Sequence, residues 1–343
     1  MKALIVASIG HTPKLVVKEI PRPNINPDEV LIKVMYAGLC GHDLAVMRGL
    51  IARNLDPQLI LGHEISGQII AVGDEVSSHS IDDNVFSALV TFCGRCNQCI
   101  SGNEYRCDSR NGIGHRIPGG FAEFVALPAK SVLKIPEGID IKHACLLSCP
   151  IGVAIRASQW VAKVNRGDSV LITGAGGGLG IHLALVADCL GAKVLASTSS
   201  PNKVAQIERL GISEVVLTNN ELPLSELALA MTEDRGVDIA LDTLGSITFK
   251  EVLRSTSLNG RIILLGEIGG SPININTTEL IFRDARVFGL AGASIKHIKS
   301  AMDILQSHKF EPVISGVFRL EDATEAYRLV QNKEILGRVI FAP

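Results

Sequence analysis

The sequence predicts an α/β protein in which a β-rich first part is followed by a doubly wound parallel sheet. Up to about residue 130, short apolar runs are separated by turns rich in Gly, Pro, Asn and Asp. From about residue 141, apolar strands alternate with helices, which is typical of a parallel sheet covered on both faces. At 343 residues the chain has room for two domains of ordinary size.

The first part is expected to contain strands at residues 3–6, 30–35, 65–72 and 121–127. Helical segments are expected at 141–147 and 151–164. The parallel sheet is then expected to use strands at 169–173, 193–196, 214–217, 238–242 and 261–266, with helices at 179–190, 201–210 and 226–231. A strand at 313–314, a helix at 322–331 and a last strand at 338–341 form a tail that returns to the first domain.

Composition indicates a globular protein with aliphatic cores. Hydrophobic residues make up 47% of the chain and aromatic residues only 4%, so Val, Ile, Leu and Ala must fill the interior. A formal net charge of −2 without a basic run argues against a nucleic-acid partner. No apolar run is long enough to span a bilayer. The first residues resemble a strand rather than a signal peptide, which together with the free cysteines predicts a cytoplasmic protein.

Four cysteines stand within fifteen residues, in the pattern C-x2-C-x2-C-x7-C. They are Cys93, Cys96, Cys99 and Cys107. Four thiolates on a polar loop suit the tetrahedral preference of zinc, and a site closed by four protein ligands is structural because it has no open position. A disulfide pair is the main alternative, and a nucleic-acid-binding zinc ribbon is another, against which the charge argues.

A glycine-rich turn joins the first strand of the parallel sheet to a helix. Its residues include Gly174, Gly177, Gly178, Leu179 and Gly180. Glycines allow a sharp turn and close approach to a pyrophosphate, which the N–H groups at the helix start then bind. The strict G-x-G-x-x-G form fails because residue 179 is Leu, but G-x-x-G-x-x-G holds. The strand and helix on either side favour a dinucleotide site over a plain flexible loop.

Four further residues are candidates for a second metal site, namely Cys40, His63, Glu64 and Cys149. Their wide spacing is uninformative by itself, and taken alone it would favour core cysteines with a surface histidine. The combination of a closed zinc loop and a dinucleotide turn in one chain favours the metal site.

Together these motifs resemble the zinc-containing medium-chain dehydrogenase/reductases, the alcohol dehydrogenase-like group. The resemblance extends over the chain and includes Gly62-His63-Glu64, the 93–107 loop, the 119–124 stretch and Gly337-Arg338. It implies a GroES-like catalytic domain at 1–148, a Rossmann domain at 149–290 and a C-terminal segment at 291–343 that returns to the catalytic domain. The family's active site lies in the cleft between the two domains.

The resemblance implies that Cys40, His63 and Cys149 hold a catalytic zinc, with Glu64 as an alternating ligand and Asp43 orienting His63. Cys145 competes with Cys149 as the third ligand, and Cys149 falls at the family's position. Such a zinc activates an alcohol, or polarises a carbonyl, for hydride exchange with a nicotinamide.

Three positions depart from the family's proton relay. His42 stands where a hydroxyl residue is usual, Ala45 replaces a histidine, and Val153 replaces a threonine. His42 is therefore a hypothetical proton carrier, because an imidazole titrates near neutral pH. A purely structural role for His42 is the alternative.

The cofactor is predicted to be NADP(H) rather than NAD(H). The second strand of the Rossmann domain ends at Thr198 without the acidic residue that binds the ribose of NAD. Ser199, Ser200 and Lys203 offer donors for a 2′-phosphate. The resemblance also assigns cofactor contacts to three residues beyond this strand, namely Leu265, Gly266 and Arg338.

The sequence thus predicts a zinc-dependent alcohol dehydrogenase or carbonyl reductase with two zinc ions per chain. An NADPH-dependent reductase of an activated C=C bond, such as an enone, a quinone or an enoyl thioester, is the second interpretation. A non-enzymatic zinc or nucleotide-binding protein is the third. The predicted partners are a small-molecule substrate and further copies of the chain, as a dimer or tetramer, with no nucleic acid and no membrane.

Overall fold

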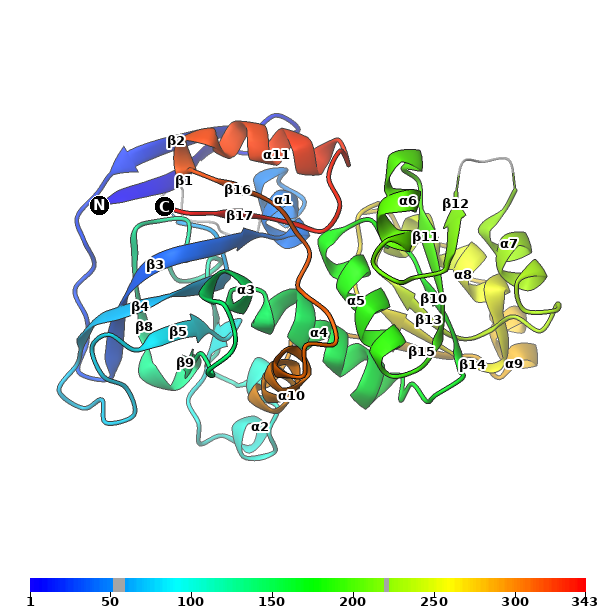
Figure 1. The fold of residues 1–343 in the computed structure, drawn as a ribbon, viewed down its shortest axis with the longest axis horizontal. Helices are drawn as coiled ribbons and strands as arrows, with labels where there is room; N and C mark the ends of the chain where they lie inside the picture. Colours follow the sequence, from blue (N-terminus) through cyan, green and yellow to red (C-terminus); the bar gives the residue numbers. More distant parts are fainter. Residues whose placement is uncertain (52–58, 219–221) are drawn as a thin grey trace. The chain divides into compact units, whose positions relative to one another are not determined.

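A computed structural model describes residues 1–51, 59–218 and 222–343, and its contacts divide the chain into two compact units (Figure 1). The first unit contains residues 1–152, 292–332 and 338–343. The second contains residues 153–291 and 333–337. The sequence places Cys149 at the start of the Rossmann domain, whereas the structure places it in the first unit.

The first unit is built on a seven-stranded sheet in the order β16-β17-β3-β4-β5-β9, with β8 also paired to β3. These strands are β3 (Glu29–Leu39), β4 (Glu64–Val72), β5 (Asn84–Ser87), β8 (Phe124–Pro128), β9 (Val132–Lys134), β16 (Ile314–Phe318) and β17 (Arg338–Phe341). In the middle of β3, buried Ile32 and Val34 alternate with exposed Lys33 and Met35, so one face of the strand lies on the core. The strand from the end of the chain, β17, lies between β16 and β3.

Two small antiparallel pairs complete the strands of the first unit. They are β1 (Lys2–Ser8) with β2 (Lys14–Glu19), and β6 (Val90–Thr91) with β7 (Asn111–Gly112). The helical segments of this unit are α1 (Gly41–Met47), α2 (Asn97–Ile100), η1 (Glu104–Arg106), η2 (Ala129–Ser131), α3 (Ile141–Ala144), η3 (Leu147–Ile151), α10 (Ile295–Gln306), η6 (Leu320–Asp322) and α11 (Ala323–Gln331).

The expected helix at 151–164 is broken into pieces that begin at η3 and continue as α4 (Gly152–Ile155) and η4 (Arg156–Val161). Pro150 lies inside η3 and has no N–H to donate, and Cys149 before it has extended backbone angles (φ −141°, ψ 126°). A residue that precedes proline is disfavoured in the helical conformation. The interruption turns Cys149 out of the helical path.

The second unit is a six-stranded parallel sheet in the order β12-β11-β10-β13-β14-β15. The strands are β10 (Ser169–Ile172), β11 (Lys193–Thr198), β12 (Glu214–Leu217), β13 (Val237–Asp242), β14 (Thr256–Leu264) and β15 (Arg286–Gly289). Counted from β10, this is the order 3-2-1-4-5-6 of the Rossmann fold, with its reversal between β10 and β13. Ligands of such sheets bind at the carboxyl ends of the strands near that reversal.

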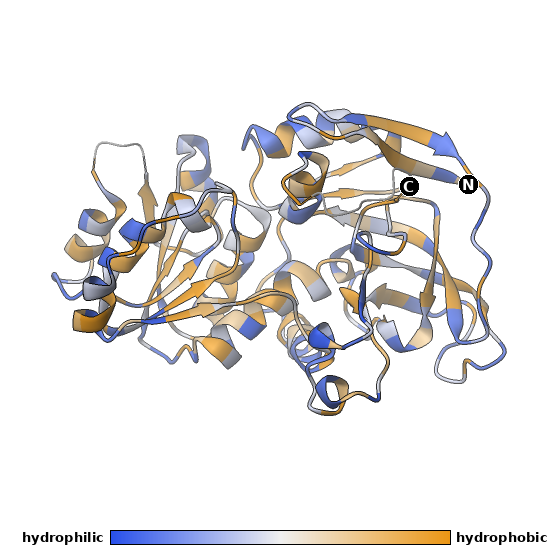
Figure 2. Cartoon of the chain, turned by 180° about the vertical axis from the view of Figure 1, so that it is seen from behind, coloured by the Kyte–Doolittle hydropathy of each residue, from blue (hydrophilic) through white to orange (hydrophobic). Residues whose placement is uncertain are grey.

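The helical segments of the second unit, besides α4 and η4, are α5 (Gly178–Cys189), α6 (Pro201–Glu208), α7 (Leu224–Ala230), η5 (Gly245–Ile247), α8 (Phe249–Ser255) and α9 (Thr277–Arg283). Figure 2 shows that the strands between them are predominantly apolar. Sequence analysis did not anticipate α8, α9, β15 or α10. It also placed the fifth strand of the sheet several residues late, because the polar start of β14 lacks an apolar pattern.

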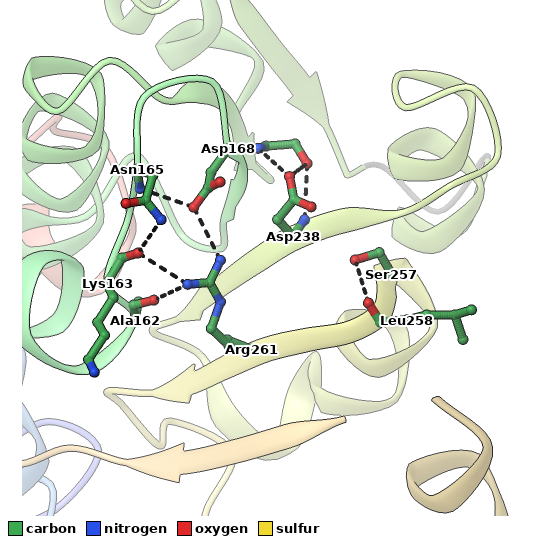
Figure 3. A network of polar contacts seen from close by, with 9 residues as sticks. Ala162, Lys163, Asn165, Asp168, Asp238, Ser257, Leu258 and Arg261 are labelled. Carbon is green, nitrogen blue, oxygen red and sulfur yellow. Dashed lines mark hydrogen bonds and ion pairs between the residues drawn. The ribbon is translucent and has the colours of Figure 1, made fainter. Parts of the chain in front are cut away.

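A polar network fixes the start of the sheet of the second unit (Figure 3). The guanidinium of Arg261 on β14 donates to the carbonyls of Ala162 and Lys163 and to Asp168 at 3.1 Å. It thereby ties the turn that follows η4 to the strands. In the described ranges, no helix is both long and apolar enough to cross a bilayer.

Candidate metal centres and cofactor loop

The four cysteines of the 93–107 loop converge on one point. Their ligand atoms all lie within 4.8 Å of one another, and the Cys96 and Cys99 sulfurs are 3.6 Å apart. Tetrahedral zinc with thiolate ligands requires sulfur separations of about 3.8 Å. No disulfide joins any of the eight cysteines. The geometry therefore fits a metal ion held by four thiolates.

Backbone N–H groups of the same loop stabilise these thiolates. The N–H groups of Arg95 and Cys96 donate to Cys93 at 3.4 and 3.3 Å, and the N–H of Cys93 donates to Cys107 at 3.3 Å. Donors aimed at sulfur stabilise its anionic form and orient it. Each partner comes from the loop itself, so the local sequence defines the whole site.

The second cluster brings together the Cys40, His63, Glu64 and Cys149 side chains, whose ligand atoms lie within 4.8 Å of one another. Cys40 caps the N-terminus of α1, the His63–Glu64 pair stands at the start of β4, and Cys149 is the residue turned out of η3. Cys145 is not part of the cluster, because its thiol donates to the carbonyl of Lys142 at 3.1 Å.

Asp43 holds the cluster together from behind. Its side chain is 1% exposed and accepts the N–H of Cys40 at 2.9 Å and of Gly62 at 3.4 Å. One of its oxygens lies 3.5 Å from Nδ1 of His63. A carboxylate at Nδ1 fixes the proton there and leaves Nε2 as the ligand atom. Its position agrees with the predicted role of orienting His63.

Glu64 is completely buried and shares the cluster with a guanidinium. Nη2 of Arg338 donates to Glu64 at 2.8 Å and lies 3.8 Å from the Cys40 sulfur. The other carboxylate oxygen of Glu64 has no hydrogen-bond partner in the described part of the chain. A Cβ atom at Gly38 would overlap that oxygen. Burial raises the pKa of Glu64, and the neighbouring Arg338 opposes this rise.

Arg338 therefore lies in the metal cluster of the first unit, where sequence analysis did not expect it. Its assignment to the cofactor stays a prediction. His42, the hypothetical proton carrier, is exposed on the first turn of α1, with its ring centroid 5.7 Å from that of His63.

The glycine turn of the second unit has the tight geometry that the sequence predicts. Gly174 has φ +63°, and a Cβ there would lie 2.6 Å from Oγ1 of Thr243. A Cβ at Gly180 would overlap the carbonyl of Gly174. Helix α5 begins at Gly178 with Gly177 as its N-cap, so its first N–H groups are available to a phosphate. Leu179 lies half-buried in the first turn of α5.

Lys203 lies against the glycine turn rather than in solvent. It is 4% exposed, and its ammonium donates to the carbonyl of Gly176 at 3.1 Å. Burial and the charge of Lys333 lower the pKa of Lys203 to about 8. Lys333, which sequence analysis missed, reaches Oγ of Ser199 at 3.4 Å. No signal in the sequence pairs residues so far apart.

The other predicted cofactor residues follow the carboxyl ends of their strands. Thr198 ends β11, is buried, and accepts the N–H of Ser200 at 3.2 Å. Leu265 and Gly266 follow β14, and a Cβ at Gly266 would overlap the carbonyl of Thr243. This loop is therefore close to the backbone that follows β13.

Two family models match these two regions. The alcohol dehydrogenase GroES-like domain matches residues 26–137, and the zinc-binding dehydrogenase model matches residues 178–307. The chain is also 35% identical to acryloyl-coenzyme A reductase of Sulfurisphaera tokodaii, over 100% of both proteins. It belongs to the zinc-containing medium-chain dehydrogenase/reductase family. The predicted family and fold are thus confirmed, and the chain is an oxidoreductase.

Other family members carry different activities in their names. The chain is 33% identical to L-threonine 3-dehydrogenase of Chelativorans sp., covering 96% of this chain and 94% of the relative. It is similar to the crystal structure of an NAD-dependent alcohol dehydrogenase, with 26% identity, a TM-score of 0.91 and 100% coverage of both chains. The family is therefore shown, whereas the substrate is not.

Proposed function

We propose that the protein is a zinc-dependent oxidoreductase that transfers hydride between NADP(H) and an alcohol or carbonyl substrate. The observation that carries the proposal is the complete donor set of Cys40, His63, Glu64 and Cys149 within 4.8 Å. A chain that needed only the fold and the cofactor would have no reason to gather two thiols around a buried imidazole and a buried carboxylate.

These residues fit a catalytic zinc on three counts. Two thiols and an imidazole are zinc ligands, Asp43 at Nδ1 of His63 leaves the other nitrogen free, and one buried oxygen of Glu64 has no partner in the described ranges. When bound, zinc supplies Lewis acidity toward the oxygen of an alcohol or carbonyl. Cys40, His63 and Cys149 would hold it, Glu64 would stand by as a further donor, and His42 would move a proton at the exposed edge of the cluster.

The lysines beside the glycine turn support NADP(H) as the cofactor. No carboxylate follows Thr198 until Glu208, so a 2′-phosphate meets no repulsion at the end of β11. Ser199 and Lys333 present a hydroxyl and an ammonium at that position. Lys203 donates to the carbonyl of Gly176 and so adds a positive charge next to the glycine turn.

Reduction of an activated C=C bond is the second candidate. The relative at 35% identity is named an acryloyl-coenzyme A reductase, and the chain lacks the family's usual relay residues at Ala45 and Val153. An enoyl thioester accepts hydride at carbon and needs a proton at the neighbouring carbon, which is a different demand from alcohol oxidation.

A metal analysis followed by two substrate panels separates the candidates. Purified protein is expected to contain two zinc ions per chain by native mass spectrometry. Turnover with NADPH is then compared on carbonyl compounds and on enones or enoyl thioesters. Loss of carbonyl reduction after replacement of Cys40, with enoyl reduction unaffected, would assign the two activities to different parts of the site. Turnover of the enoyl panel alone would contradict the first proposal.

We also propose that the protein is a cytoplasmic homo-oligomer, as a dimer or a tetramer. Apolar side chains are exposed on α9 and on the edge strand β15, among them Ile281, Phe282 and Phe288. Exposed apolar side chains beside an unpaired strand edge favour association of copies. Sedimentation of the purified protein tests this.

A further inference from the structure

A third histidine lies beside the second metal cluster. The ring centroid of His115 is 5.2 Å from that of His42, with 68° between the ring planes. The ring of His42 meets that of His63 at 5.7 Å and 87°. Both are edge-to-face contacts of the kind that aromatic rings favour. His42 is exposed on α1, so these two rings restrict a side chain that would otherwise be free to rotate.

The turn that carries His115 is fixed to the segment just before His63. A Cβ at Gly114 would lie 2.8 Å from the backbone nitrogen of Gly62, and a Cβ at Gly119 would overlap the Gly62 carbonyl. The N–H of Gly119 donates to Ile60 at 2.8 Å, and the N–H of Gly120 donates to Gly62 at 2.8 Å. Only glycines allow two backbones to approach this closely. The ring of His115 and the ligand His63 are therefore held by one rigid assembly.

The turn is also closed on itself and connected to the cysteine loop. The N–H groups of His115, Arg116 and Ile117 all donate to the carbonyl of Gly112, at 3.2, 2.8 and 3.3 Å. Gly112 belongs to β7, which pairs with β6 directly before Cys93. The loop that closes on four thiolates thus ends in the turn that carries His115.

The chemistry of His115 points to a role for its ring rather than for its charge. Its Nδ1 is buried without a hydrogen-bond partner in the described residues. Burial, together with the charges of His42 and Arg116, lowers the pKa of His115, so the ring stays neutral at neutral pH. A neutral ring whose Nδ1 makes no hydrogen bond in the described residues is suited to packing against the ring of His42.

We propose that His115 is a positioning residue that holds the imidazole of His42 beside His63. The proposal rests on the function proposed for His42, because it assigns to His115 the task of orienting that proton carrier. The cysteine loop then contributes to the reaction as well as to the fold, because it leads into the turn that carries His115, whose ring orients His42.

The test compares His115→Ala with His115→Phe, and uses Arg116→Ala on the same turn as a matched control. We expect His115→Ala to lower kcat about three- to tenfold, with little change in KM and with both zinc ions retained. His115→Phe keeps an aromatic edge and is expected to stay within about twofold of wild type, as is Arg116→Ala. Equal losses in His115→Ala and His115→Phe would overturn the proposal, as would an unchanged kcat in His115→Ala.

Histidine-selective NMR of the zinc-loaded protein supplies a readout that does not depend on turnover. We expect cross-relaxation between the ring protons of His42 and His115, and a shift of the His42 signals in His115→Ala that His115→Phe largely reverses. Absence of the cross-relaxation in wild type would overturn the proposal even if His115→Ala failed to fold. A protein without oxidoreductase turnover would contradict the proposed function instead, while the ring contacts remained measurable.

Discussion

The two cysteine clusters of the first unit differ in their ligands and in the segments that support them. In the 93–107 loop, four thiolates face one another, and the backbone N–H groups that stabilise them come from the same short segment. In the second cluster, two thiols share the site with an imidazole and a carboxylate. Their support comes from Asp43 on α1 and from Arg338 on the last strand.

The difference indicates how a protein separates a metal that holds the fold from a metal that reacts. A local loop with four identical ligands saturates its ion and folds around it. A cluster assembled from distant segments is held by the rest of the unit, so we expect the fold to survive without the ion. We expect only the second arrangement to exchange a ligand, because Glu64 has both a salt-bridge partner and an oxygen without a partner in the described residues.

The largest effect is expected for Cys40→Ser. Loss of one thiolate from the second cluster should reduce kcat/KM by about a thousandfold or more, while the melting temperature changes by only a few degrees. Activity and thermal unfolding are measured on the same preparation. Cys145→Ser is the matched control, because a hydroxyl still donates to the carbonyl of Lys142. A cooperative loss of folding in Cys40→Ser would contradict the proposed contrast.

The converse is expected for Cys107→Ser. Zinc binding at a closed site contributes directly to folding, so the melting temperature should fall by roughly 10 °C and one zinc per chain should be lost. The zinc of the second cluster should remain at low temperature. Native mass spectrometry gives the metal count, and finding two zinc ions in Cys107→Ser would remove the structural role from the loop.

Asp43→Asn should weaken the second cluster alone. Replacing the carboxylate behind His63 is expected to lower zinc affinity there by about 10- to 100-fold and to leave the cysteine loop loaded. Competition with a chelator, followed by metal analysis, measures this. Asp83→Asn, which disrupts a 2.8 Å ion pair with Lys134 outside both clusters, is the control. Equal zinc loss in Asp43→Asn and Asp83→Asn would show that Asp43 makes no specific contribution to zinc binding.

Two lysines of the second unit also differ in their surroundings, because Lys203 is buried and Lys333 is exposed. Lys203 is buried against the glycine turn, whereas Lys333 binds only the exposed Ser199 among the contacts described here. We expect Lys333→Met to weaken NADPH binding about tenfold and NADH binding by less than twofold, measured by fluorescence titration. Lys193→Met, at the opposite end of β11, is the control. Wild-type protein that binds NADH as tightly as NADPH would contradict the cofactor assignment.

The smallest effect is a dependence of stability on pH. The pKa of Lys203 is lowered to about 8 in the folded protein, from about 10.4 in the unfolded chain. Between these values the unfolded state binds more protons, so this group makes the folded state more stable as pH rises from about 8 to 10. Urea unfolding should show a gain of roughly 1 kcal/mol over that range relative to Lys203→Met. An identical slope in both proteins would exclude the effect.

Sequence patterns predicted the local features of this protein and missed those that depend on distant partners. The cysteine loop, the glycine turn and most strands of the parallel sheet are visible because their periodicity or spacing is short. Arg338 beside Glu64, Lys333 beside Ser199 and His115 beside His42 are not, because each pair lies far apart in the sequence. The sequence predicts Lys203 as a cofactor residue, yet no pattern shows that it is buried. Pro150 was visible, but its effect on Cys149 became clear only in the structure.

The position of β17 has a consequence for how the protein is made. This strand is separated from β3 by the whole second unit in the sequence, yet it lies inside the sheet of the first unit, between β16 and β3. Every residue of the second unit precedes β17 in the chain, so that unit can form on the nascent chain before β17 is synthesised. Until β17 is made, β3 can pair with β4 and β8, but its end at Ala37–Leu39 lacks the partner that β17 provides on its other edge. The metal cluster beside Arg338, the first residue of β17, is therefore completed in the same step as the sheet.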